Sequence, residues 1–195
     1  VVVGFNFSFG REAKGTPELL IDKLVPNNIV VHVEPPFEYG ESIVSSSLIR
    51  RQIRAGNMML VKALLGYPYH LCGEVVHGAQ NGRAMNFPTA NIDYDESLIL
   101  PSLGVYAARA WLAEEPDKKY DGVLNIGTRP TVDDSPKITV EIHMLEFDQD
   151  IYGRKLCIEI YHFLRQISKF KDLSELKTTI SMDVVNAKKF FATEV

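Results

Sequence analysis

One strictly alternating stretch decides how this chain folds: Ile138-Thr139-Val140-Glu141-Ile142-His143-Met144. Successive side chains of a strand point to opposite faces, so the apolar residues share one face and the polar residues share the other. The pattern predicts a strand with one buried face. Glu141, held on the polar face of a rigid strand, is a candidate general base. An ordinary exposed strand residue is the alternative, and this stretch alone leaves both open.

Further strand-like stretches surround it at residues 69–77, 104–113, 120–126 and 155–164. Clusters of Gly, Pro and Asp separate them, without helical patterns in between, which is typical of an antiparallel sheet or barrel. After the last stretch, Asp172 and Glu175 have the spacing of a capping box at the start of a helix. Apolar residues then recur every three or four positions and predict the buried face of this helix: Leu173, Leu176, Ile180, Val184, Ala187 and Phe191.

The first 60 residues alternate strand and helix instead. Residues 1–7 predict a buried parallel strand, and residues 29–33 predict a second short strand. Between them, Pro17 is suited to the first turn of a helix that runs to about Leu24. The order of these elements is typical of part of an α/β fold.

Two short helices complete this first part. Ser45, Ser46 and Ser47 supply N-cap hydroxyls for a helix that ends near Gly56, and residues 60–65 predict another helix. The chain begins without Met, inside a strand-like run, so we expect that further sequence precedes Val1.

The composition excludes several classes of protein. The 195 residues carry 21 Lys and Arg against 25 Asp and Glu, a net charge of −4, whereas a general nucleic-acid binder is usually basic. The apolar runs are too short to span a membrane. Cys72 and Cys157 are too few for a disulfide framework or a zinc site, and we expect two small buried thiols in a reducing compartment.

The stretch from Gly82 to Asn91 is the most unusual one for its chemistry. Pro88 fixes the backbone before Thr89, and Thr89 and Asn91 are two residues apart, so on a strand they face the same side. A hydroxyl and an amide oxygen are hard ligands that suit Mg²⁺ carried by a nucleotide. A turn that enters a strand with two polar side chains is the alternative.

Two segments of the first part are candidates for phosphate binding. Residues 10–16 resemble a phosphate-binding loop in spacing, but Thr16 and Pro17 stand where that motif needs Lys and then Ser or Thr. The helix opened by residues 45–47 carries Arg50, and helix N-termini attract phosphates. Ordinary capping is the alternative for this helix. The five histidines of the chain show no metal-binding spacing.

Taken in order, the motifs of the second part resemble the riboflavin kinase domain. They are Phe87-Pro88-Thr89-Ala90-Asn91, Gly104-Val105-Tyr106, Asn125-Ile126-Gly127 with Arg129-Pro130-Thr131, Glu141 with His143, Phe147-Asp148, and Asp150 with Tyr152-Gly153. In the first part, Gly4 to Gly10 and the stretch from Ser45 to Arg50 resemble the later part of the FMN adenylyltransferase (FAD synthetase) domain. The whole chain therefore resembles the bifunctional bacterial riboflavin kinase/FAD synthetase family, with its beginning absent.

This resemblance implies a fold and a domain division. Residues 61–195 would form a six-stranded antiparallel Greek-key β-barrel with a C-terminal helix. Residues 1–60 would be the C-terminal part of the adenylyltransferase domain, a partial α/β Rossmann-like segment.

The resemblance also implies roles for single residues. Glu141 matches the catalytic base, and Thr89 and Asn91 match the ligands of Mg²⁺-ATP. A flap over the nucleotide contains Gly78, Gly82 and Arg83. The flavin side, including a second flap over residues 165–170, contains Asn125, Arg129, Arg165 and Phe170. The remnant of the adenylyltransferase site consists of Asn6, Phe7, Ser45, Ser46, Ser47 and Arg50.

The implied activity is the transfer of the γ-phosphoryl group of ATP to riboflavin, giving FMN, with Mg²⁺ as cofactor. The full-length protein would also adenylylate FMN to FAD, which we do not expect of this chain. We expect a cytoplasmic enzyme without nucleic-acid or membrane partners; oligomerisation stays open. A non-catalytic flavin- or nucleotide-binding barrel is the alternative. Two positions depart from the family: Asn86 stands where Gly is usual, and Gln166-Ile167 replaces Pro-Glu.

Overall fold

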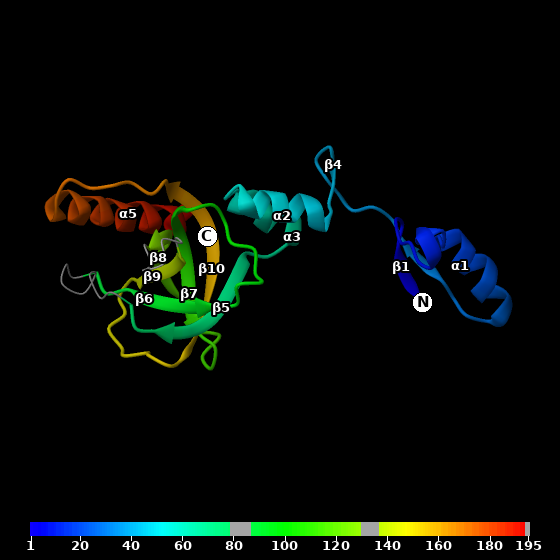
Figure 1. The fold of residues 1–195 in the computed structure, drawn as a ribbon, viewed down its shortest axis with the longest axis horizontal. Coiled ribbons are helices and arrows are strands. Elements are labelled where there is room, and N and C mark those ends of the chain that lie inside the picture. The colour runs from blue at the N-terminus through cyan, green and yellow to red at the C-terminus, as the bar shows by residue number, and fades with distance from the viewer. Residues whose placement is uncertain (79–86, 130–136, 194–195) are drawn as a thin grey trace. The chain divides into compact units, whose positions relative to one another are not determined.

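The computed structural model describes residues 1–78, 87–129 and 137–193, except for the side chain of Arg129. The chain forms two compact units, Val1–Ser46 and Ser47–Val195 (Figure 1). This division lies upstream of the boundary expected near residue 60, because Ile53, Met58 and Val61 belong to the core of the second unit. Within the described ranges, none of the helices is both long and apolar enough to cross a membrane.

The first unit is a strand, a helix and a parallel strand. β1 (Val2–Gly4) pairs with β2 (His32–Glu34) in parallel, and α1 (Pro17–Leu24) lies between them in sequence, flanked by two 3₁₀ turns, η1 (Arg11–Ala13) and η2 (Val25–Asn27). α1 has the predicted bounds, and the hydroxyl of its N-cap residue Thr16 accepts a hydrogen bond from the Leu19 amide at 3.4 Å. The prediction of a buried first strand is wrong for this unit, because Val2 is 68% exposed. A Rossmann-like origin of the unit stays a prediction.

A short hairpin and two helices follow. The hairpin of β3 (Glu38–Tyr39) and β4 (Ser42–Ile43) had no signal in the sequence pattern. α2 (Ser46–Arg54) and α3 (Met58–Leu65) confirm the two predicted helices, and Gly66 ends α3 in the left-handed conformation. Gly56, between them, has a φ of 75°, and a Cβ there would lie 2.6 Å from the Ser102 hydroxyl oxygen. The turn can therefore pack against the barrel only with glycine at this position.

The second unit is a closed six-stranded antiparallel barrel, which confirms the expected architecture. The strands follow the order β10-β5-β6-β9-β8-β7 around the barrel. β6 therefore lies beside β9 and not beside β7, which follows it in sequence. The strands are β5 (Tyr69–Val76), β6 (Ala90–Tyr94), β7 (Gly104–Leu112), β8 (Tyr120–Arg129), β9 (Lys137–Met144) and β10 (Lys155–Arg165).

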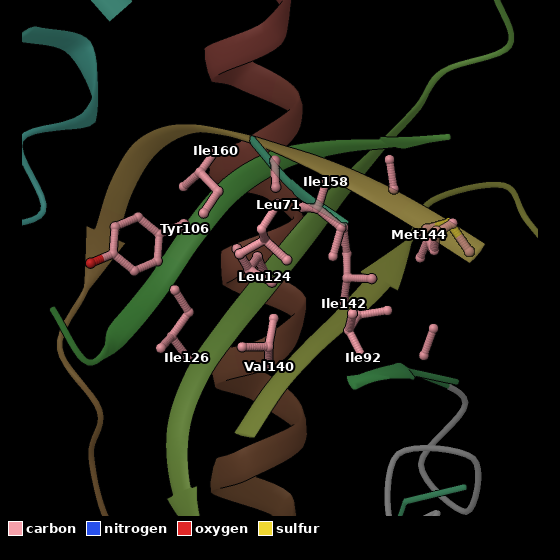
Figure 2. Close-up of a cluster of buried hydrophobic side chains, with 14 of the residues drawn as sticks. Leu71, Ile92, Tyr106, Leu124, Ile126, Val140, Ile142, Met144, Ile158 and Ile160 are labelled. Carbon is pink, nitrogen blue, oxygen red and sulfur yellow. The ribbon is translucent and has the colours of Figure 1, made fainter. Parts of the chain in front are cut away.

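Apolar side chains from every strand fill the interior of the barrel. On β9, Val140 and Ile142 are buried, as the alternation predicts, and they meet Leu124 of β8 and Ile92 of β6 (Figure 2). Because the apolar face of each strand points inward, the polar residues of β6, β8 and β9 are left on the outer face.

The C-terminal helix α5 (Leu173–Thr193) covers part of this outer face. Ala187 and Phe191 pack on Val105 of β7 and Tyr161 of β10, so the predicted face of the helix is correct at its C-terminal end. At its start, Asp172 accepts a hydrogen bond from the Glu175 amide at 2.8 Å, as a capping box requires. Leu173 is 72% exposed, so its expected burial is wrong. It lies in the first turn of the helix, ahead of the residues that pack on the barrel.

Cys72 and Cys157 correct a third expectation. They are directly opposite each other on β5 and β10 and form a disulfide. They are 85 residues apart in sequence, and only the register of the closed barrel makes them neighbours. The expectation of two free thiols is therefore wrong.

Candidate functional site

Polar residues from three neighbouring strands form one row on the outer face of the barrel. In the register of β6, β9 and β8, Glu141 is directly opposite Asn91 on one side and Asn125 on the other. Directly opposite residues on one face have Cβ atoms about 5 Å apart. The fold therefore brings together three predicted site residues that come from segments far apart in the sequence.

The row continues to Arg165, a residue that the family resemblance predicts on the flavin side. Asn125 is opposite Val105 of β7, and Val105 is opposite Arg165 of β10. Glu141, Asn125 and Arg165 thus lie at one level around the barrel.

A cavity of about 420 Å³ opens beside the row. Thr89 and Asn91 line it, together with apolar residues from the barrel and the acidic segment that follows β9. Its remaining lining residues are Val75, Gly78, Pro88, Ala90, Ile142, Met144, Phe147, Asp148, Gln149, Asp150, Ile151 and Tyr152. The mixture of an apolar floor and a few polar groups is typical of a small-molecule site.

Gly78 closes one side of this cavity against Asn91. A Cβ at position 78 would overlap the Asn91 amide group, so glycine lets the backbone come directly onto this amide. The rest of the predicted nucleotide flap, including Gly82 and Arg83, lies outside the described residues, as does the departure at Asn86.

The residues present fit a divalent metal that arrives with a nucleotide. Thr89 and Asn91 place a hydroxyl and an amide in the same cavity, and these are oxygen donors that Mg²⁺ accepts. The described residues hold no group of three or more His, Cys, Asp or Glu side chains that could bind a metal without help. Phosphate oxygens and water would have to complete the coordination.

One aromatic contact at this site had no role in the sequence analysis. The Tyr152 ring lines the cavity and stacks on the His77 ring, with 3.8 Å between the ring centroids. Asp150 accepts a hydrogen bond from the Tyr152 amide at 3.2 Å and so fixes the turn that carries this tyrosine. The motif Asp150-x-Tyr152-Gly153 was the available signal, but only the fold shows that Tyr152 reaches the cavity.

Arg165, a predicted flavin-side residue, is held by a buried carboxylate of α5. Its Nε and Nη2 atoms donate hydrogen bonds to Asp183 at 2.9 and 2.8 Å, and the Asp183 side chain is only 5% exposed. The guanidinium group also lies over the Phe170 ring, 5.7 Å from its centroid. Arg165 and Phe170 thus lie together, their role toward a flavin stays a prediction, and Asp183 is a partner that sequence reasoning missed.

The other predicted residues belong to other elements of the chain. Asn6, Phe7, Ser45 and Ser46 belong to the first unit, whereas Ser47 and Arg50 belong to α2 in the second unit. These predicted adenylyltransferase residues are exposed. The Arg129 backbone ends β8, and its side chain lies outside the described part of the chain.

Comparison with known proteins identifies the family. The riboflavin kinase (flavokinase) family profile matches residues 65–191, which include the whole barrel, the cavity and most of α5. The chain belongs to the riboflavin kinase family.

Relatives of this family extend the likeness to almost the whole chain. A bifunctional riboflavin kinase/FMN adenylyltransferase of Bacillus subtilis is 37% identical over 193 residues, which are 98% of this chain and 60% of the relative. The Escherichia coli protein of the same description is 35% identical, with the same coverage of both chains. This chain therefore spans about 60% of the length of these relatives.

A solved structure supports the fold. A crystal structure described as a macrolide-efflux protein from Streptococcus pneumoniae is 30% identical and has a TM-score of 0.85. The match covers 95% of this chain and 58% of that protein. Its described activity belongs to that protein, and what carries over to this chain is the likeness of fold.

Proposed function

We propose that this chain phosphorylates riboflavin with ATP and produces FMN. The observation that carries the proposal is the row of Asn91, Glu141 and Asn125 beside a cavity lined by Thr89, in a member of the riboflavin kinase family. A carboxylate next to a nucleotide-sized cavity is what the transfer of a phosphoryl group to an alcohol requires.

Glu141 acts as the general base in this proposal. It accepts the proton of the ribityl 5′-hydroxyl as that oxygen bonds to the γ-phosphorus, while the bond from phosphorus to the bridging oxygen of ADP breaks. Because the strand fixes the carboxylate, the reaction gains from positioning as well as from proton removal.

Thr89 and Asn91 hold Mg²⁺ with the nucleotide in the same proposal. When bound, the metal neutralises charge on the phosphates. Thr89 and Asn91 orient the phosphates toward the row that contains Glu141, and Gly78 begins the flap with Gly82 and Arg83. The acidic net charge of the chain does not oppose ATP binding, since the metal offsets the phosphates.

The flavin is proposed to bind on the Arg165 side of the row. Asn125 can donate and accept hydrogen bonds through its amide, and Phe170 offers an aromatic face. Arg129 is assigned to the flavin side on the family resemblance alone. Arg165 already lies beside Asp183, which supports a role in organising this side and not in carrying a free charge.

The activity of the whole protein is a separate proposal. We propose that a longer form adenylylates FMN to FAD, with Asn6, Phe7, the serines 45–47 and Arg50 as parts of that site. Its support is the description of the relatives, of which this chain spans about 60%. A cytoplasmic location and the absence of nucleic-acid or membrane partners belong to the same proposal, because both substrates are small molecules.

One incubation tests these proposals. Residues 1–195 are mixed with riboflavin, ATP and Mg²⁺, and the flavins are separated by chromatography. FMN as the sole product is the expected result. Binding of riboflavin without any product would favour the non-catalytic barrel, and substantial FAD would contradict the expectation that residues 1–60 are an incomplete adenylyltransferase.

A further inference from the structure

The backbone pairing between β6 and β9 begins at Ala90, so the proposed metal ligand Thr89 lies one residue outside it. Its two pairs are Ala90 with Ile142 and Asn91 with Glu141. Pro88, one residue before Thr89, has no N–H to donate and cannot extend the ladder. Something other than strand pairing must therefore hold Pro88 and Thr89 against β9.

The His143 side chain makes that connection. Its Nδ1 atom lies 2.8 Å from the Pro88 carbonyl oxygen. A carbonyl only accepts hydrogen bonds, so Nδ1 carries the proton and donates it. The His143 ring also contacts the Phe87 ring edge-on. The ring centroids are 5.4 Å apart, and the angle between the ring planes is 84°. One side chain of β9 thus holds two consecutive residues ahead of Thr89.

The contact acts on the part of the chain that lines the nucleotide cavity. Pro88, Thr89 and Asn91 all line it, and His143 lies on the same face of β9 as Glu141, two residues away. β9 therefore carries the proposed base and, one position further along this face, the group that anchors the proposed ligands.

We propose that His143 is a positioning residue for nucleotide binding, which acts by holding Pro88 and so fixing the Thr89 hydroxyl beside Asn91. The inference rests on the proposed function. It assigns His143 neither contact with substrate nor proton transfer. Its loss is expected to weaken Mg²⁺-nucleotide binding while riboflavin binding and the chemical step change little.

Two substitutions separate the hydrogen bond from the bulk of the ring. His143→Phe keeps a ring against Phe87 but removes the donor, whereas His143→Asn keeps a nitrogen donor near the position of Nδ1. The loss of one such bond predicts a dissociation constant for Mg²⁺-ADP and a KM for ATP about three- to tenfold higher in His143→Phe. His143→Asn should stay within about twofold of the unsubstituted chain.

Calorimetry with Mg²⁺-ADP and fluorescence titration with riboflavin measure the two sites without turnover. The result that supports the proposal is weaker Mg²⁺-ADP binding in His143→Phe, rescued in His143→Asn, with unchanged riboflavin affinity and thermal unfolding. The proposal would be overturned by unchanged Mg²⁺-ADP binding in His143→Phe. It would also be overturned by an equal loss of Mg²⁺-ADP affinity in His143→Phe and His143→Asn. If His143→Phe does not fold, His143→Leu takes its place.

The same measurements separate this inference from the proposed function. If the unsubstituted chain forms no FMN, the proposed function fails. The comparison of Mg²⁺-ADP binding in the two variants still supports or overturns the role of His143, because it requires no turnover. If the unsubstituted chain does not bind Mg²⁺-ADP, both proposals fail together.

Discussion

At the scale of single residues, the position of Glu141 depends on its two neighbours across the sheet. Asn91 and Asn125 are opposite it on β6 and β8, so an amide side chain stands on each side of the carboxylate. Amide groups can orient a carboxylate without adding a competing charge. The role of Glu141 can therefore be tested without disturbing the fold.

Glu141→Gln should lower kcat for riboflavin phosphorylation by about 10²- to 10⁴-fold, because the amide cannot accept the hydroxyl proton. The KM for ATP should stay within about twofold, since the base does not hold the nucleotide. Steady-state kinetics with ATP and riboflavin measures both. Glu74→Gln is the matched control, an exposed carboxylate on β5, and it should leave kcat unchanged. Normal turnover in Glu141→Gln would remove it as the base.

Thr89→Ala should weaken Mg²⁺-ATP binding by about tenfold, because a hydroxyl ligand of the metal is lost. Calorimetry with Mg²⁺-ADP measures the effect, and the affinity for riboflavin should stay constant. Thr128→Ala, at an exposed position of β8, is the control. Equal nucleotide affinity in Thr89→Ala and Thr128→Ala would count against the metal role.

Sequence reasoning reached these residues for different reasons. The spacing of Thr89 and Asn91 and the alternation around Glu141 are local, so the sequence predicted which side chains share a face. The contacts between His77 and Tyr152 and between His143 and Pro88 were not predictable. They join residues 75 and 55 positions apart and depend on the closure of the barrel.

At the scale of elements, α5 is fixed to the barrel by charged and aromatic contacts. Tyr161 of β10 packs edge-on against Phe191, and its hydroxyl donates a hydrogen bond to Glu159 at 2.9 Å. Burial, together with this bond to Glu159, raises the pKa of Tyr161 to about 12. Lys119 also donates to Glu159, at 2.8 Å, so the carboxylate has two partners.

The raised pKa of Tyr161 predicts a loss of stability in alkaline solution. Between pH 10 and 12 the folded chain keeps a proton on Tyr161 that the unfolded chain has released, so the free energy of unfolding falls as pH rises. Denaturant unfolding across this range should show the decline. Tyr161→Phe should show a shallower one, because its side chain does not titrate. Identical slopes in both proteins would contradict the assignment.

The ion pair between Arg165 and Asp183 fixes α5 to the end of β10. Asp183→Asn should lower the free energy of unfolding by about 1–3 kcal/mol, because the partly exposed Arg165 loses its charged partner. The affinity for riboflavin should fall as well if Arg165 organises the flavin side. Urea unfolding and fluorescence titration measure the two effects.

An exposed ion pair provides the control for this prediction. Lys188 and Glu146 are 3.3 Å apart, and their side chains are 55% and 85% exposed. Lys188→Gln should change the free energy of unfolding by less than about 1 kcal/mol. If Asp183→Asn and Lys188→Gln lower the free energy of unfolding equally, burial of the Arg165–Asp183 pair does not increase its contribution to stability.

The elements themselves were predicted unevenly. The bounds of α1 were predicted closely, because Pro17 marks its start locally. β6 has only five residues, so its alternation is too short to stand out. Leu173 fits the helical period but is exposed, since periodicity does not show where the barrel ends.

At the scale of the whole molecule, the chain consists of two compact units, and the boundary between them in the sequence lies between Ser46 and Ser47. The six strands, the cavity and α5 all belong to the second unit. Closure of the barrel was expected from the resemblance to a family, because alternation alone cannot tell an open sheet from a closed one. The disulfide between Cys72 and Cys157 was missed for a related reason, as it requires the register of β5 against β10.

Residues 47–195 alone should therefore fold and phosphorylate riboflavin, with kcat within about twofold of the longer chain. Thermal unfolding and the chromatographic assay measure this, with residues 1–195 as the reference. An unfolded or inactive 47–195 fragment would show that the first unit is needed for the barrel.

The pairing of β5 with β10 also affects how the protein is made. β5 ends at Val76, and β10 begins at Lys155, about 80 residues later. A ribosome that adds about 5–20 residues per second needs roughly 4–16 s to synthesise that interval. Throughout it, β5 can pair with β6 but not with β10, and Cys72 has no disulfide partner. The nascent barrel is therefore open to chaperone binding and aggregation until its last strand leaves the ribosome.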